Sequence, residues 1–225
     1  MKIVLSDLEK RCLEISYVNG LSHLSSVLTS VGVIDDIYAS KKPGDIFVLG
    51  NSHAALALFV VLEKYGFGDA SALARKHGTH ASRDPAAGIF VSGGSLGQPE
   101  TVAVGLALAD RNRNVFLLTS DGALAEGSIW ESLRIANDIR LENLHVHVIA
   151  NGLGAYSEID IDDLQQRLEA FFPARIHRVG LDGYPAWIRG IDGHYLRLDE
   201  AQYREILGSA DPATVESNTH TLNHE

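Results

Sequence analysis

The chain has a single cysteine among its 225 residues, and no apolar run reaches the ~18 residues that a membrane-spanning helix needs. One thiol, Cys12, excludes an intrachain disulfide and a cluster of thiolate metal ligands. Cys12 falls in a helical pattern, which favours a buried residue without a chemical role over a nucleophile. The longest apolar segment, residues 54–62, ends at Glu63, and the N-terminus turns polar at Ser6, too early for a secretory signal. We therefore expect a cytoplasmic protein in a reducing setting.

Positive charge is also scarce. The chain has 19 Lys and Arg against 29 Asp and Glu, a formal net charge of −10. This balance argues against a broad nucleic-acid-binding surface. It leaves open an anionic ligand that backbone amides or a metal ion hold. The composition, 45% hydrophobic and 21% charged, is that of an ordinary soluble protein, long enough for one α/β domain with a real core.

Short apolar runs alternate with helical periodicity along the chain. Strands are expected at 45–49, 114–119, 144–150 and 175–179, and helices at 5–17, 25–38, 54–65, 70–76, 99–109, 126–139 and 161–171. We expect Ser25 or Ser26 to cap the second helix, and Asn51 or Ser52 the third. The pattern predicts an α/β fold with a doubly wound, mostly parallel sheet and helices on both faces. Residues 1–209 would form this domain, and the polar stretch 210–225 a frayed tail.

Polar side chains follow two of the buried strands. Asp121 comes after the strand at 114–119, and Asn151 after the strand at 144–150. One helix connects these strands, so they should be parallel and place both side chains at the carboxyl edge, where open α/β sheets bind ligands. Carboxylate, amide and carbonyl oxygens suit Mg²⁺ or Ca²⁺ better than zinc. An Asp-Gly pair after a strand is also an ordinary turn, and spacing alone leaves both interpretations open.

Several segments of the chain carry recognisable motifs. Ser120-Asp121-Gly122, with Asn151 at its distance, is similar to a metal–diphosphate motif that begins with Gly where this chain has Ser120. Four further segments accompany it: DGALAEGSIWE at 121–131, GSLGQ and AVGLALA at 94–109, GNSHAA at 50–55, and SHLSS at 22–26. Together these segments resemble the transketolase family of thiamine diphosphate enzymes, and they follow the family's order over roughly residues 10–155.

The resemblance implies a role for each segment. Asp121 and Asn151 would bind the metal through their side chains, and Leu153 through its carbonyl. The imidazoles of His23, His53 and His80 would contact substrate and move protons, with His77 as the replacement for His80 if the loop slips. The implied cofactor-binding set, which includes some of the same residues, is His53, Gly94, Ser95, Leu96, Asp121, Gly122, Ala123, Glu126, Asn151 and Leu153.

Other residues stay undecided at this stage. Glu126 and Glu131 match acidic residues near the family's interface between active sites, or are simply exposed helix charges. His145 and His147 alternate on one strand face, which indicates packing or an interface. His194 faintly resembles a later pocket histidine, but a segment that normally precedes it in the family is missing here.

The resemblance also implies a partner. In the family a glutamate of a second, pyrimidine-binding domain helps to form the reactive carbanion of the cofactor, and 225 residues leave room only for the diphosphate-binding domain. We expect a split transketolase, an α2β2 heterotetramer in which this N-terminal subunit joins a C-terminal one. The reaction would be two-carbon ketol transfer from a ketose or its phosphate to an aldehyde or aldose.

Three alternatives remain. The shortened region after Asn151 fits a specialised acyloin-forming or ketol-transferring enzyme, as do the substitutions Asn51, Ser52, Pro99 and Ser120. A non-catalytic scaffold subunit would have kept the fold alone. A generic Mg-nucleotide binder is disfavoured, since the chain lacks a GxxxxGK[ST] loop.

Overall fold

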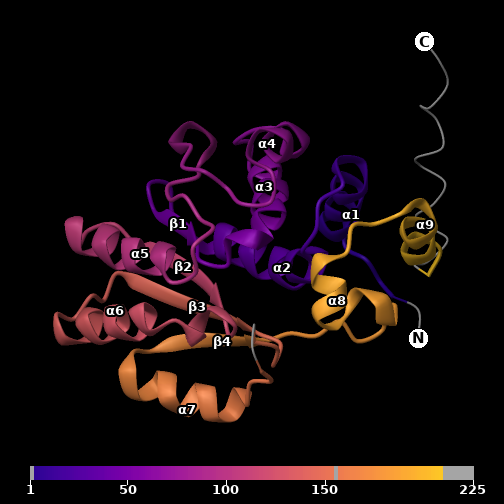
Figure 1. The fold of residues 1–225 in the computed structure, drawn as a ribbon. Helices are drawn as coiled ribbons and strands as arrows, with labels where there is room; N and C mark the ends of the chain where they lie inside the picture. The colour runs from indigo at the N-terminus through magenta and orange to yellow at the C-terminus, as the bar shows by residue number, and fades with distance from the viewer. Residues whose placement is uncertain (1–2, 155–156, 210–225) are drawn as a thin grey trace.

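The computed structural model describes residues 3–154 and 157–209 of the chain. A four-stranded sheet lies at its centre in the order β1–β2–β3–β4, with every neighbouring pair parallel (Figure 1). This confirms the predicted α/β fold, and each expected strand agrees with the structure to within one residue at either end. The strands are β1 Ile46–Leu49, β2 Val115–Ser120, β3 Leu144–Ala150 and β4 Ala174–Arg178.

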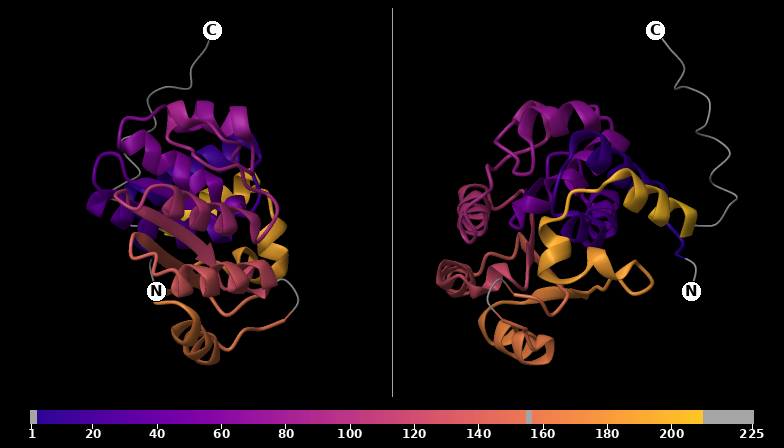
Figure 2. Two further views of the ribbon diagram at one scale, coloured as in Figure 1. Left: turned by 90° about the vertical axis from the view of Figure 1, so that its left-hand side faces the viewer. Right: turned by 45° about the vertical axis from the view of Figure 1, so that its right-hand side comes forward.

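Helices cover both faces of the sheet, because successive side chains of each strand point to opposite sides. Leu118 on β2 packs into one core with the first four helices, while Val115 and Leu117 pack into a second core with the next three. Figure 2 shows these layers from two further sides. The first four helices are α1 Asp7–Asn19, α2 Leu24–Ser40, α3 Ala55–Lys64 and α4 Ala70–His77. The next three are α5 Gln98–Ala109, α6 Gly127–Asp138 and α7 Ile161–Phe171.

Helix starts show where local sequence rules hold and where they fail. At α1, Ser6 and Glu9 form a capping box, with the Glu9 amide donating to the Ser6 hydroxyl over 3.2 Å. The predicted caps of the next two helices are wrong. His23 occupies the position before α2 with φ 67° and makes no side-chain cap bond. Its amide donates to the carbonyl of His194 at 2.8 Å. A 3₁₀ turn, Ser52–Ala54, precedes α3, and no side chain caps it.

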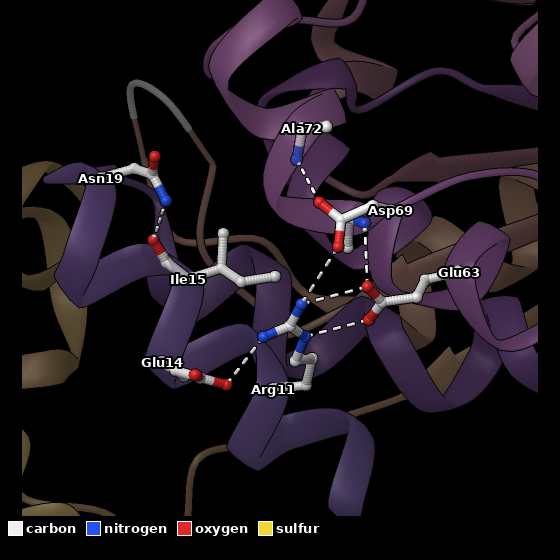
Figure 3. A network of polar contacts seen from close by, with 8 residues as sticks. Arg11, Glu14, Ile15, Asn19, Glu63, Asp69 and Ala72 are labelled. Atoms are coloured by element: carbon white, nitrogen blue, oxygen red, sulfur yellow. Dashed lines mark hydrogen bonds and ion pairs between the residues drawn. The ribbon is translucent and has the colours of Figure 1, made fainter. Parts of the chain in front are cut away.

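A polar network fastens α1 to α3 and α4 (Figure 3). The Arg11 guanidinium binds both carboxylate oxygens of Glu63, at 2.9 and 3.0 Å, and also Glu14 at 2.9 Å. Glu63 in turn accepts a bond from the Ala70 amide at 3.0 Å, at the start of α4. The bonds from Arg11 hold the pKa of Glu63 below its usual range. This network holds α3, which follows the histidine motif at 50–55, against α1 and α4.

The C-terminal part of the described chain returns to the N-terminal helices. Two short helices that the sequence pattern did not predict, α8 Gly190–Tyr195 and α9 Glu200–Ser209, follow β4. The rings of Tyr17 and Tyr203 stack with centroids 4.6 Å apart, and the Tyr184 hydroxyl donates to Glu9 at 2.8 Å. These contacts hold α9 and the segment before α8 against α1, while the bond from the His23 amide to His194 holds α8 beside the start of α2. The predicted tail, 210–225, lies outside the described residues, and no described helix is long and apolar enough to cross a membrane.

Candidate active site

Four histidines from four separate segments come together. The ring of His23 lies 5.3 Å from that of His53, 6.1 Å from His80 and 4.4 Å from His194, centroid to centroid. His53 and His194 are 5.2 Å apart. The three histidines predicted as catalytic are thus brought together, and His194, which the sequence left undecided, joins them. His77 does not, because it packs on Phe59 and faces Asp84 instead.

The environment of the cluster keeps three of its imidazoles neutral. Burial, reinforced by the neighbouring histidines, lowers the pKa of His23 to about 4 and that of His53 to about 3. Burial also lowers the pKa of His194. Near pH 7 these three rings are therefore uncharged, each with one N–H donor and one nitrogen acceptor. Each neutral ring can therefore donate one hydrogen bond to a ligand oxygen, while its lowered pKa makes it a weak proton acceptor near pH 7.

Two serines contact ring nitrogens of the cluster. The Ser22 hydroxyl lies 2.8 Å from Nδ1 of His23, and the Ser52 hydroxyl lies 3.2 Å from Nδ1 of His80. Ser52 is itself fixed by the backbone of Gly93, where a Cβ would overlap the serine side chain. Sequence reasoning considered Ser52 as a helix cap and as a substitution, and did not anticipate either contact.

At the carboxyl ends of β2 and β3, Asp121 organises the predicted metal site. Its carboxylate accepts bonds from the amides of Gly122, Asn151 and Gly152, each at 2.8 Å. The Asn151 side-chain oxygen accepts from the Leu153 amide at 2.9 Å. A Cβ placed on Gly122 would lie 3.5 Å from the Leu153 carbonyl oxygen, so that oxygen faces the same turn. The predicted ligands Asp121, Asn151 and Leu153 therefore lie on two adjoining turns.

This donor set fits a hard divalent cation. Three amides occupy only part of the acceptor capacity of the Asp121 carboxylate, and one amide occupies part of that of Asn151. Burial of Asp121 raises the pKa of its carboxyl and outweighs the opposing effect of the three amide bonds. A buried carboxylate in that position gains most from a bound cation. Among the described residues, no cluster of three or more His, Cys, Asp or Glu side chains offers another metal site.

A glycine-rich loop joins the two halves of the site. A Cβ on Gly94 would lie 4.0 Å from the His80 ring, and one on Gly97 would lie 3.1 Å from Cβ of Glu126. Both glycines have positive φ, 123° and 83°, which side chains with a Cβ rarely adopt. The loop between them, with Ser95 exposed and Leu96 half-buried, therefore bridges the histidine cluster and the segment that follows Asp121.

The remaining predicted residues take varied positions. Ala123 is buried in the turn after Asp121, and its amide donates to the Ser120 hydroxyl at 3.2 Å. Ser120, which stands where the family's motif has Gly, therefore stabilises this turn. Glu126 is half-buried and immediately precedes α6, whereas Glu131 is exposed on that helix.

Sequence reasoning missed one buried acid at the site. Glu100, in the first turn of α5, is only 1% exposed and accepts a bond from the Thr119 hydroxyl at 2.6 Å. Its second carboxylate oxygen has no partner among the described residues, and burial raises the pKa of the group. Gly50 leaves the space that Glu100 fills, because a Cβ there would overlap the carboxylate. The signal available in the sequence was a glutamate on the apolar, buried face of the expected helix at 99–109.

A wide surface groove lies elsewhere on the described part of the chain. It runs along the amino ends of β2 to β4, where Phe116, His145 and Arg175 line it, and none of the residues predicted for the site do so. His145 stacks on Phe116, and Nδ1 of His147 lies 2.9 Å from Nε2 of His177. This fits the expected packing role of the alternating histidines. The chemistry of the opposite edge, rather than groove size, identifies the candidate site.

Fold and site together define a parallel α/β protein with an oxygen-ligand site and a histidine pocket. Residues 34–173, more than half of the chain, match the family described as "Transketolase, thiamine diphosphate binding domain". The chain belongs to this family.

Individual relatives agree with that assignment. The chain is 30% identical over 185 residues to one of the subunits of the apulose-4-phosphate transketolase of Phocaeicola vulgatus, covering 72% of this chain and 66% of that protein. It is 34% identical over 165 residues to the transketolase of Pongo abelii, covering 65% of this chain but only 26% of the relative. A solved transketolase structure from Pichia stipitis shares the fold with a TM-score of 0.64 at 18% identity, covering 89% of this chain and 40% of that one.

Proposed function

We propose that this chain is the N-terminal, diphosphate-binding subunit of a split transketolase-like enzyme. It would transfer a two-carbon ketol unit from a ketose or ketose phosphate to an aldehyde or aldose. The observation that carries the proposal is the loop at 94–97, which links the histidine cluster to the turn after Asp121. Thiamine diphosphate and Mg²⁺ would bind beside this loop, between the histidine cluster and the turn after Asp121.

Each part of the chain has a definable task. Asp121, Asn151 and the Leu153 carbonyl would hold the cation, while His53 and the amides of Gly122 and Ala123 would face the diphosphate. Gly94, Ser95 and Leu96 would lie along the rings of the cofactor, which supplies an electron sink for the cleaved carbon–carbon bond. Glu126 would lie toward the cofactor and the subunit interface.

The histidines would act on the substrate. The rings of His23, His53 and His80 would donate hydrogen bonds to hydroxyl and carbonyl oxygens of the substrate and help to move its protons. Donors that are already in place where negative charge develops stabilise the transition state without reorganisation. A loss of about 3 kcal/mol, or roughly 10²-fold in rate, is the usual effect of removing one such donor.

A partner subunit would complete the site. The relative from Phocaeicola vulgatus is named as one subunit of its enzyme. The chain is also 29% identical to the 6-deoxy-6-sulfo-D-fructose transketolase subunit SqwG of a Clostridium species, covering 78% of this chain and 68% of that protein. We propose that a C-terminal subunit supplies the pyrimidine-binding domain with its glutamate, in an α2β2 heterotetramer.

Reconstitution tests the proposal. The chain is mixed with a candidate C-terminal subunit, thiamine diphosphate and Mg²⁺, and two-carbon transfer is followed between a ketose phosphate and an aldose phosphate. We expect activity with the wild type, a loss of roughly 10²-fold or more in His23→Ala, and little change in His145→Ala, a half-buried histidine outside the cluster. Unchanged activity in Asp121→Ala would instead support a non-catalytic scaffold.

A specialised substrate is the second candidate. Ser52, where the sequence departs from the family's histidine motif, contacts His80 and so alters the pocket directly. Transfer from an unphosphorylated or modified ketose, with no turnover of the standard sugar phosphates, would favour this alternative.

A further inference from the structure

The hydroxyls of Ser22 and Ser52 each meet a histidine of the cluster at the same ring atom. Ser22 Oγ lies 2.8 Å from Nδ1 of His23, and Ser52 Oγ lies 3.2 Å from Nδ1 of His80. No other hydrogen-bond partner of either hydroxyl is found among the described residues. The two serines come from different parts of the chain, one just before α2 and the other in the turn before α3.

Burial decides the direction of the bond at Ser52. The residue is only 4% exposed, and a buried hydroxyl without an acceptor costs about 1–3 kcal/mol. If Nδ1 of His80 carried the proton, it would donate to the serine, and the serine hydrogen would be left without an acceptor. If Nδ1 carries no proton, the hydroxyl donates to it and the serine hydrogen has an acceptor. The second arrangement places the imidazole proton on Nε2.

The same arrangement fits His23. The ring is neutral at pH 7, since burial and its histidine neighbours lower its pKa to about 4. The bond from the His23 amide to the His194 carbonyl, at 2.8 Å, fixes the backbone of His23. The His23 ring and the Ser22 hydroxyl therefore keep their relative positions. No described protein group bonds to Nε2 of His23 or of His80, which leaves both atoms available to a ligand.

We propose that Ser22 and Ser52 are positioning residues that hold His23 and His80 in the Nε2–H tautomer, so that both rings present N–H donors to the substrate. In this state the two rings bind atoms that accept hydrogen bonds: the hydroxyl and carbonyl oxygens of a polyhydroxy ketone or aldehyde. This assigns the substrate class only if the proposed function holds, but the tautomers themselves do not depend on it.

Tautomers are measured directly by long-range ¹H–¹⁵N correlation spectra of the full chain labelled at histidine, without cofactor or partner. His23→Gln and His80→Gln assign the two signals among the ten histidines. We expect both rings to be Nε2–H in the wild type. Ser22→Ala should shift the tautomer ratio of His23 alone by roughly fivefold, and Ser52→Ala that of His80 alone. Ser82→Ala, an exposed serine on the His80 loop, should change neither.

Two further variants keep the test decisive. Ser22→Thr retains the hydroxyl and should restore the wild-type pattern, whereas a change of packing alone would not be rescued. Ser52→Gly removes the hydroxyl without adding volume if Ser52→Ala fails to fold. An Nδ1–H ring in the wild type, or tautomer ratios unchanged in the alanine and glycine variants, would overturn the proposal. Either outcome leaves cofactor binding, and so the proposed function, to be judged separately.

Discussion

Glu100→Gln isolates the energetic cost of the buried acid at the site. Glu100 is 1% exposed, one carboxylate oxygen accepts from Thr119, and the other has no partner among the described residues. Burial raises its pKa above the ordinary 4.5. The native state therefore keeps a proton that the unfolded state releases, so stability falls as pH rises above about 4.5, until the folded pKa is passed.

Glutamine has the same shape, still accepts from Thr119 and does not titrate. We expect the variant to match the wild type near pH 5 and to exceed it by about 1–3 kcal/mol at pH 8, the range for a buried polar group that lacks a partner. Urea unfolding of the full chain at both pH values, with unchanged m, measures this difference. Glu142→Gln, at an exposed glutamate, should stay within about 0.5 kcal/mol at either pH. Equal pH dependence in Glu100→Gln and the wild type would refute the reasoning.

Three other substitutions follow from the packing, and urea unfolding of the full chain measures each. Gly50→Ala should cost about 1–3 kcal/mol, because its Cβ would overlap the Glu100 carboxylate; a stable variant would show that this space is not filled. Arg11→Ala should cost about 1–2 kcal/mol at pH 7, and less once acid has protonated Glu63, whose pKa Arg11 lowers; a penalty that grows in acid would contradict the ion pair. Gly193→Ala, in α8, should cost about 1–3 kcal/mol, because its Cβ would overlap the carbonyl of Ile188, which precedes that helix; a neutral effect would contradict this packing.

Sequence periodicity predicted the sheet well, because buried strands and amphipathic helices carry their signal locally. The capping box of α1 also lies within four residues, although no cap was predicted there. The start of α2 was predicted to within one residue, but its cap was wrong: His23 takes the position before the helix, and its amide bonds to His194, which lies far along the chain. The short helix α8 has two glycines in six residues and no usable periodicity, so only contacts with the N-terminal helices define it.

In the candidate site, too, sequence patterns predicted some residues, and contacts between distant segments determined the rest. Family resemblance named His23, His53 and His80, and the structure brings them together, but it could not place His194 across a shortened region. The contact between Ser52 and His80 spans 28 positions and depends on how Gly93 packs on the serine. Nothing local in the sequence encodes such a contact.

The central claim is a shared cofactor site built on Asp121. Calorimetric titration of thiamine diphosphate with Mg²⁺ into the full chain, alone and mixed with a candidate C-terminal subunit, tests it most directly. We predict binding that appears or tightens with the partner, requires Mg²⁺, and is lost in Asp121→Ala but kept in Glu142→Gln. No binding in either state, or binding that Asp121→Ala leaves unchanged, would contradict the assignment of the site.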